Sequence, residues 1–130
     1  MFGNFSVQIE DFAKRHFINS FEKKYKNKWD LTLLYVTQEL ERIDNLLLTS
    51  RAETITDSQN IKIIKTQFRV VSTKESAKTS GNRCIVAWNT EKQTVSVLLV
   101  YGKTDLSGKN ETAEWKKIIR ENYPEYSKLV

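Results

Sequence analysis

The 130-residue chain is predicted to be a single α+β domain spanning residues 1–130. Three observations predict this class. Apolar residues recur at helical spacing through the first 50 residues, they follow strand spacing between residues 64 and 101, and helical spacing returns near the end of the chain. We therefore expect two N-terminal helices packed on a small antiparallel sheet, a three-strand meander with room for a fourth strand, and a C-terminal helix.

The N-terminal helices are predicted from two apolar stripes. Aromatic side chains recur at every fourth position within residues 9–28, and apolar side chains alternate three and four apart within residues 33–47. Between the stripes, Asp30 and Thr32 are both able to cap the second helix. We therefore expect a helical hairpin whose shared apolar face covers the sheet.

The rest of the chain changes to the twofold spacing of strands and returns to helical spacing at its end. The expected elements are, in order, a loop at 49–60, a strand at 64–70, a loop at 72–82, a strand at 83–88, a turn at 89–93, a strand at 94–101 and a helix at 111–122. Short links between the strands favour an antiparallel meander. The helices are expected to cover one face of this sheet and to leave the other face free, with Lys65 and Arg69 on it.

Positive charge is concentrated in the middle of the chain. The chain has 21 Lys and Arg residues against 16 Asp and Glu residues, which gives a formal net charge of +5. Residues 61–110 hold nine basic and three acidic residues, whereas residues 1–60 sum to −1 and residues 111–130 to zero. Such a concentrated excess is typical of proteins that bind polyanions such as nucleic acids. The alternative is a solvated basic surface that serves solubility.

Composition excludes several other classes of protein. A single cysteine, Cys84, cannot form an internal disulfide, and the sequence shows neither a signal peptide nor a long apolar segment. We therefore expect a cytoplasmic protein without membrane contact. Zinc-ligand spacings, glycine-rich phosphate loops and the common hydrolase motifs are missing from the sequence, so no metal site and no cofactor are predicted. The one histidine, His16, lies on the first predicted helix, away from the basic segment.

The basic segment suits the cleavage of RNA without a metal ion. When the 2′-hydroxyl of RNA attacks the neighbouring phosphorus, negative charge builds on the phosphate oxygens, and fixed Lys and Arg side chains stabilise it. A base must take the 2′-proton and an acid must protonate the leaving oxygen; because no histidine is nearby, these roles would fall to a carboxylate, a Lys or a Tyr. Binding of nucleic acid or of an acidic partner without catalysis is the alternative at this stage.

Four short stretches resemble the RelE/ParE toxin superfamily of bacterial type II toxin–antitoxin systems. They are a basic strand Phe68-Arg69-Val70-Val71, the sequence Ser80-Gly81-Asn82-Arg83 that opens an apolar strand, the strand end Tyr101-Gly102-Lys103, and the helical stretch from Phe17 to Tyr25. The order of elements also matches that family over nearly the whole chain. The resemblance implies a RelE-like fold and a ribosome-associated mRNA endonuclease that acts in the ribosomal A site. It also implies a cognate antitoxin protein that wraps and neutralises the toxin.

The resemblance assigns roles to individual residues. Arg69, Arg83 and Lys103 match basic positions of the family, so we predict them to be catalytic, with Arg83 stabilising the scissile phosphate. Among the neighbouring residues, those predicted to bind nucleic acid are Lys65, Lys78, Ser80 and Tyr101. For Tyr101 the choice is between stacking on a base and packing in the sheet, and packing is favoured.

Two alternatives follow from the same resemblance. A ParE-like member would inhibit DNA gyrase by protein contact and would have no nuclease activity, whereas a non-catalytic member of the fold would bind RNA or a protein partner. Thr104 and Asp105 follow Lys103, where many active members have a further arginine or a nearby histidine. The resemblance therefore does not assign the general acid and the general base.

Overall fold

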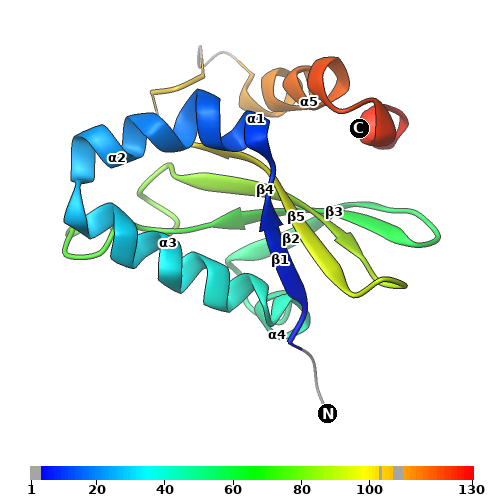
Figure 1. Cartoon of the computed structure of the whole chain (residues 1–130), viewed down its shortest axis with the longest axis horizontal. Coiled ribbons are helices and arrows are strands. Elements are labelled where there is room, and N and C mark those ends of the chain that lie inside the picture. The colour runs from blue at the N-terminus through cyan, green and yellow to red at the C-terminus, as the bar shows by residue number, and fades with distance from the viewer. Residues whose placement is uncertain (1–3, 103, 107–109) are drawn as a thin grey trace.

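The computed structural model describes residues 4–102, 104–106 and 110–130, and its centre is a five-stranded sheet (Figure 1). The strands are β1 (Ser6–Ile9), β2 (Ala52–Asp57), β3 (Ile61–Gln67), β4 (Arg83–Asn89) and β5 (Thr94–Tyr101). Their spatial order is β1-β5-β4-β3-β2. β1 runs parallel to β5, and all other neighbours are antiparallel. The predicted α+β class and the antiparallel meander, β3-β4-β5, are confirmed.

Helical segments precede and follow the strands of the sheet. They are α1 (Asp11–Ala13), the π-helical η1 (Lys14–Ile18), α2 (Asn19–Tyr25), α3 (Asn27–Leu40), α4 (Ile43–Leu46), α5 (Glu111–Asn122) and the 3-10 helix η2 (Pro124–Leu129). The α2–α3 hairpin lies at the left of Figure 1, and α5 lies apart from it at the upper right. The predicted N-terminal hairpin and C-terminal helix are therefore present.

Both edge strands were missed by the strand prediction. β2 lies within residues 49–60, where a loop was expected, and β1 lies immediately before the first helix. β2 has no fully buried residue and carries a register shift between Thr54 and Thr56, so its side chains do not alternate regularly between buried and exposed. β1 has four residues, too few for a periodic pattern to stand out. Short or irregular edge strands of this kind have no clear sequence signal.

The boundary between the first two helices lies earlier than predicted. The chain turns at Lys26, whose φ of 51° is in the left-handed region, and α3 begins at Asn27. Asp30 and Thr32 therefore lie inside α3, and the prediction that they cap it is wrong. The Thr32 hydroxyl donates to the carbonyl of Lys28 at 2.7 Å and accepts from the backbone N–H of Val71 at 2.9 Å. Thr32 thus ties α3 to the loop that follows β3.

The predicted second helix, residues 33–47, is also interrupted. α3 ends at Leu40, and the short helix α4 continues from Ile43 to Leu46. The apolar residues of this region nevertheless face the core as expected, because Leu40, Ile43 and Leu46 are all buried. The backbone changes direction while the same side of the chain stays against the sheet.

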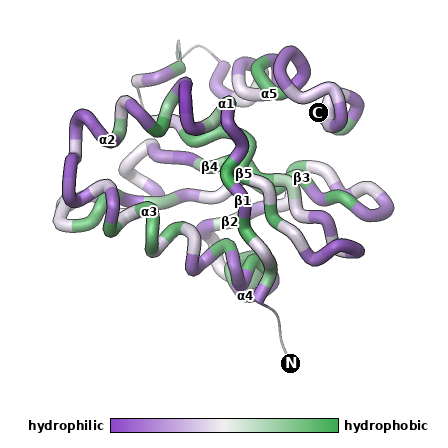
Figure 2. Tube along the Cα trace, viewed as in Figure 1, coloured by the Kyte–Doolittle hydropathy of each residue, from purple (hydrophilic) through white to green (hydrophobic). Residues whose placement is uncertain are grey.

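The first core lies between the sheet and the N-terminal helices. Phe21 and Trp29 stack with their ring centroids 4.6 Å apart and contact the side chain of Phe68. The sheet contributes Ile64 and Val86 to the same core. Hydrophobic and hydrophilic residues alternate along α2 and α3, as expected for helices that cover a sheet with one face (Figure 2).

The second core covers the opposite face of the sheet, which was predicted to be free. Trp115 and Ile119 of α5 are fully buried against a set that includes Ile63, Ile85 and Leu99. Farther along the chain, the Tyr123 hydroxyl donates to the carbonyl of Leu98 at 2.6 Å. The prediction of a free face is therefore wrong over the middle of the sheet, because the final helix packs there.

Removal of the Trp115 side chain tests this second core. Trp115→Ala is expected to lower the free energy of unfolding by about 3–5 kcal/mol, because a fully buried indole is replaced by a cavity. Lys117→Ala, an exposed position on the same helix, should change it by less than about 0.5 kcal/mol. Urea unfolding followed by circular dichroism measures both variants. Equal stability of the two variants would contradict the packing of α5 as part of the second core.

Candidate functional site

One end of the second sheet face stays open, and several predicted site residues meet there. In the register of the sheet, Gln67 pairs with Arg83, and Arg83 pairs with Tyr101. Lys65 lies two positions before Gln67 on β3, so its side chain points to the same face. α5 begins only at Glu111, so it covers the middle of this face and leaves the end exposed.

The open end forms a pocket of about 420 Å³. Its lining residues are Ser50, Arg51, Ala52, Glu53, Lys65, Gln67, Lys78, Arg83 and Glu111. Four of these are basic and two are acidic, so the lining carries a formal charge of +2, although one of the four, Arg51, is ion-paired with Glu39 outside the pocket. An open pocket with this excess, formed at the ends of neighbouring strands, has the charge that a phosphate group requires.

The carboxylate of Glu111 is held by two neighbours through one of its oxygens. Oε2 accepts a hydrogen bond from the Tyr101 hydroxyl at 2.5 Å and lies 3.1 Å from the ammonium Nζ of Lys65. Among the described residues, the other oxygen, Oε1, accepts no hydrogen bond. The carboxylate is therefore fixed in position by two donors, and in the part of the chain that the structure describes its second oxygen has no partner.

The charge state of Glu111 follows from these contacts. Partial burial alone would raise the pKa of Glu111, but the hydrogen bonds from Tyr101 and Lys65 outweigh burial and hold the pKa below its usual range. Glu111 is also the first residue of α5, where the helix dipole favours negative charge. The carboxylate is thus ionised at neutral pH.

Tyr101 packs in the sheet, with 1% of its surface exposed. Burial first, and then the hydrogen bond to the Glu111 carboxylate, raise the pKa of Tyr101 well above its usual value. The phenol therefore stays protonated and acts as a donor. Its ring is not open for stacking on a base, so its contribution to the pocket is to position Glu111.

Arg83 borders the pocket and also organises the loop before β4. Nη1 donates to the carbonyls of Asn82 at 2.9 Å and Ala77 at 3.3 Å, and Nη2 donates to the carbonyl of Lys78 at 3.0 Å. Three of the five guanidinium N–H groups are used in this way, and the other two have no acceptor among the described residues. Arg83 therefore places its positive charge at the pocket in a fixed orientation.

The loop that Arg83 holds carries two more of the predicted residues. Lys78 is exposed and lines the pocket. Ser80 is buried: its hydroxyl donates to the carbonyls of Phe68 and Ala77 and accepts from the backbone N–H of Asn82. Gly81 has a φ of 75°, which glycine adopts without strain, so the Ser-Gly-Asn-Arg sequence forms a tight turn into β4.

Of the other two predicted catalytic residues, one lies away from this pocket and one cannot be placed. Arg69 lies beyond the end of β3, lines a hollow beside α3, and donates to the carbonyl of Thr73 at 3.5 Å. Lys103 lies outside the described residues. Of the predicted set, the structure brings together Lys65, Lys78 and Arg83, with Tyr101 beneath them.

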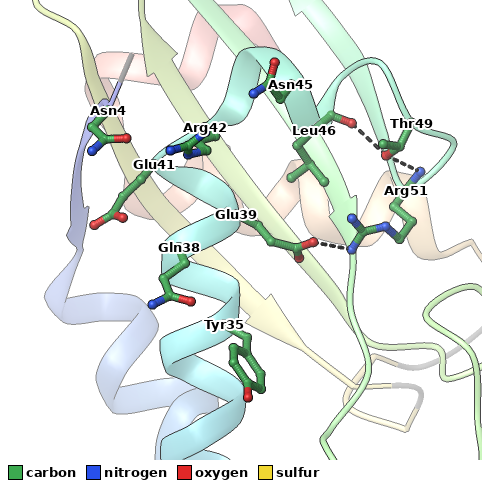
Figure 3. A pocket seen from close by; sticks show the side chains of 10 residues that line it. All are labelled: Asn4, Tyr35, Gln38, Glu39, Glu41, Arg42, Asn45, Leu46, Thr49 and Arg51. Atoms are coloured by element: carbon green, nitrogen blue, oxygen red, sulfur yellow. Dashed lines mark hydrogen bonds and ion pairs between the residues drawn. The ribbon is translucent and has the colours of Figure 1, made fainter. Parts of the chain in front are cut away.

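A larger hollow of about 660 Å³ lies at the C-terminal end of α3 (Figure 3). It is lined by two acidic and two basic residues, Glu39, Glu41, Arg42 and Arg51, and the Glu39 carboxylate forms an ion pair with Arg51 at 2.5 Å. Because these charges cancel, this hollow has no excess of positive charge for a phosphate group. The basic pocket is the stronger candidate despite its smaller volume.

Within the described ranges, no three His, Cys, Asp or Glu side chains come close enough to hold a metal ion, and no helix is long and apolar enough to cross a membrane. Cys84 is fully buried, and burial raises the pKa of its thiol to about 12. A thiol with this pKa is not a nucleophile at neutral pH.

Sequence reasoning missed Glu111 and Arg51 in the pocket. Glu111 follows Asn110, whose side chain caps α5 by accepting from the N–H of Ala113 at 3.0 Å. An acidic residue in the first turn of a helix is common, so the sequence pattern alone does not mark Glu111 as a site residue. Its role becomes visible only when the fold places it against Lys65.

Comparisons with known proteins support the fold. No family model matches the chain, and no curated protein matches its sequence. A chain in the crystal structure of the archaeal RelE-RelB complex from Pyrococcus horikoshii OT3 superimposes with a TM-score of 0.55 at 10% sequence identity. The match covers 82% of this chain and 99% of that chain. The expectation of a RelE-like fold is therefore confirmed.

The Glu111 contacts predict a pH-dependent stability. The pKa of Glu111 in the folded chain lies below the value of about 4.3 in an unfolded chain. The stabilisation is therefore complete above the unfolded pKa and is lost as the pH falls through the folded pKa. Because the Glu111 side chain is 43% exposed, Glu111→Gln should cost at most about 1 kcal/mol at pH 7, and less at pH 3.

Urea unfolding of the wild type and Glu111→Gln at the two pH values measures this effect. Glu121→Gln, which changes an exposed carboxylate on the same helix, serves as the matched control. The free energy of unfolding should differ more between wild type and Glu111→Gln at pH 7 than at pH 3. An equal difference at both pH values would contradict a lowered pKa of Glu111.

Proposed function

We propose that this chain is the toxin of a bacterial type II toxin–antitoxin system and that it cleaves mRNA on the ribosome without a metal ion. The observation that carries the proposal is the basic pocket, in which Lys65, Lys78 and Arg83 surround an ionised carboxylate. The fold supports it, because a similar fold occurs in the RelE-RelB complex. The toxin would act in the cytoplasm, where mRNA and ribosomes are found.

The pocket suits an RNA phosphate through its fixed positive charges. Arg83 offers its two remaining N–H groups, and Lys78 provides an exposed ammonium group. As the 2′-oxygen attacks phosphorus, charge on the non-bridging oxygens increases, and donors fixed in advance stabilise that charge more than the ground state. Arg83 needs no reorganisation during this step because the loop carbonyls already hold it.

Glu111 and Lys65 are the pocket residues that can carry the two proton transfers of this reaction; the lowered pKa of Glu111 keeps it ionised and makes it a weak base. In the proposed step, Glu111 Oε1 takes the proton of the 2′-hydroxyl, the 2′-oxygen forms a bond to phosphorus, and the bond from phosphorus to the 5′-oxygen breaks. The Lys65 ammonium gives a proton to the leaving 5′-oxygen. The products are a 2′,3′-cyclic phosphate and a 5′-hydroxyl. Each proton transfer of this kind contributes a factor of about 10²–10⁴ to the rate.

A protein partner is supported by an exposed apolar stripe on α3. Leu31, Leu34 and Tyr35 are 42%, 51% and 50% exposed, and their spacing places them on one side of the helix. We propose that an antitoxin covers this stripe, because an exposed apolar surface is typical of the core of a protein–protein interface and does not bind the charged backbone of RNA.

A ParE-like inhibitor of DNA gyrase is the second candidate function. The observation that favours it is the internal pairing of the pocket, because Lys65 already contacts Glu111 and Arg83 already binds three carbonyls. These contacts would hold the sheet end together even if no RNA were cleaved. Of the two candidate functions, mRNA cleavage produces broken transcripts and gyrase inhibition does not.

The nuclease proposal is tested by induced expression followed by mapping of transcript ends. Wild-type protein should arrest growth and produce new 5′ ends, whereas Lys65→Ala and Glu111→Gln should each reduce cleavage about 100-fold or more because a proton-transfer group is lost. Lys92→Ala removes the same charge from an exposed turn and should cleave like the wild type.

Growth arrest with intact transcripts would instead support gyrase inhibition. Wild-type cleavage by Glu111→Gln would overturn the role of Glu111 as the base. Arg83→Ala is the less specific variant, because it also removes the donors that hold the loop at Ala77, Lys78 and Asn82.

The antitoxin proposal predicts that a charge in the α3 stripe releases the partner. Leu34→Glu should weaken co-purification with the proposed antitoxin by about tenfold or more, because it places a charge in an apolar contact. Leu48→Glu introduces the same charge at a leucine that is 85% exposed and lies outside the stripe, so it should leave binding unchanged. Equal loss in both variants would contradict the assignment of the stripe.

A further inference from the structure

We propose that Arg51 is a second phosphate-binding arginine of the basic pocket and that Glu39 binds its guanidinium when no RNA is present. This role of Arg51 rests on the proposed function, in which the ligand of the pocket is an RNA phosphate. Arg51 lines the basic pocket and also both hollows beside α3, of about 660 and 650 Å³. One side chain therefore borders both the candidate RNA site and the helix next to it.

The backbone of Arg51 is fixed beside the basic pocket. Its carbonyl accepts a hydrogen bond from the N–H of Gln67 at 2.8 Å, and Gln67 pairs with Arg83 in the sheet. Residues directly opposite each other on neighbouring strands share a face of the sheet. The next residue, Ala52, packs against the first core, so strand alternation directs the side chain of Arg51 toward the opposite face, which is the face of the basic pocket.

The guanidinium of Arg51, in contrast, is bound outside the pocket. Nη1 lies 2.5 Å from Oε2 of Glu39, and Figure 3 shows the side chain of Arg51 extended toward that residue of α3. β2 is an edge strand, so an arginine at its start is able to pass around the edge of the sheet. In the part of the chain that the structure describes, Glu39 is the one partner of this guanidinium.

The contact between Arg51 and Glu39 is one that a phosphate can replace. Their side chains are 38% and 35% exposed, so solvent and salt screen the attraction. A phosphate accepts two parallel hydrogen bonds from a guanidinium, which favours the exchange. Rotation about the side-chain bonds of Arg51 moves its guanidinium to the basic pocket, while the backbone hydrogen bond with Gln67 stays in place.

The two positions of this guanidinium give the basic pocket two different charges. While Glu39 pairs with Arg51, the formal charge of +2 on the lining is partly cancelled from outside the pocket. When the guanidinium joins Lys78 and Arg83, the full charge acts on the phosphate. Each phosphate contact also releases bound counterions, so it makes RNA binding more dependent on salt. The salt dependence of binding therefore reports whether Arg51 contacts a phosphate.

Binding of a short single-stranded RNA with 2′-fluoro groups in place of its 2′-hydroxyls tests this role of Arg51. The RNA keeps its phosphates but lacks the attacking group, so it is bound without being cleaved. Fluorescence anisotropy over a series of salt concentrations gives the affinity and its salt dependence. Arg51→Gln should weaken binding about fivefold or more and reduce the slope of log affinity against log salt by about 0.7, the share of one phosphate contact.

Glu39→Gln is the complementary variant, because it removes the competing carboxylate and keeps Arg51. It should strengthen RNA binding about two- to fivefold, the range expected for the loss of an exposed ion pair in the free chain. The gain should disappear in the double variant Glu39→Gln/Arg51→Gln, because Glu39 acts through Arg51. A carboxylate that merely repelled the RNA would give the same gain with and without Arg51.

Arg42→Gln and Glu41→Gln are the matched controls, because both residues line a hollow beside α3 and neither lines the basic pocket, so both variants should bind RNA nearly like the wild type. An unchanged salt slope in Arg51→Gln, or an equal gain from Glu39→Gln in both backgrounds, would overturn the inference and leave the ion pair a structural link between α3 and β2. The expected pattern in a chain that leaves transcripts intact would uphold the role of Arg51 and refute the nuclease proposal. Cleavage by the wild type with an unchanged slope in Arg51→Gln would do the reverse.

Discussion

The hydrogen bonds that Tyr101 and Lys65 donate to one oxygen of Glu111 connect the main parts of this structure. They join the first turn of α5 to β5 and β3, the two neighbours of the central strand β4. The same contacts keep the carboxylate ionised where it lines the pocket. The same interaction therefore holds the first turn of α5 against the sheet and keeps the Glu111 carboxylate ionised.

The alternation of side chains along β4 and β5 gives this sheet end two different surfaces. Arg83 and Tyr101 pair across the two strands and face the basic pocket, whereas Asn82 and Gly102, one step further, face a second, smaller pocket beneath α2. The basic pocket carries excess positive charge and the smaller pocket a slight negative charge.

The sequence predicted the parts of the fold that have strong periodicity. The meander, the hairpin of N-terminal helices and the final helix all bury regular apolar stripes, so their patterns were visible. β2 was missed because it is an irregular edge strand. The packing of α5 on the second sheet face was missed because the spacing of Trp115 and Ile119 predicts a buried helix face and does not identify the surface that this face contacts. In the site, Lys65, Lys78 and Arg83 were found from local charge. Glu111 was not, because only the tertiary fold brings it to β3.

The structure changes the meaning of the basic middle segment. Its positive charge does not cover an open sheet face, since α5 occupies most of that face. Lys62 instead lies 3.9 Å from Asp57 and over the ring of Trp88, on the other face from Lys65. Only the basic residues whose strand position points to the open end reach the pocket, and Arg51, from outside the segment, joins them. Which basic residues line the pocket therefore depends on the alternation of side chains along the strands and on where α5 begins. The net charge of the segment does not predict the charge of the pocket.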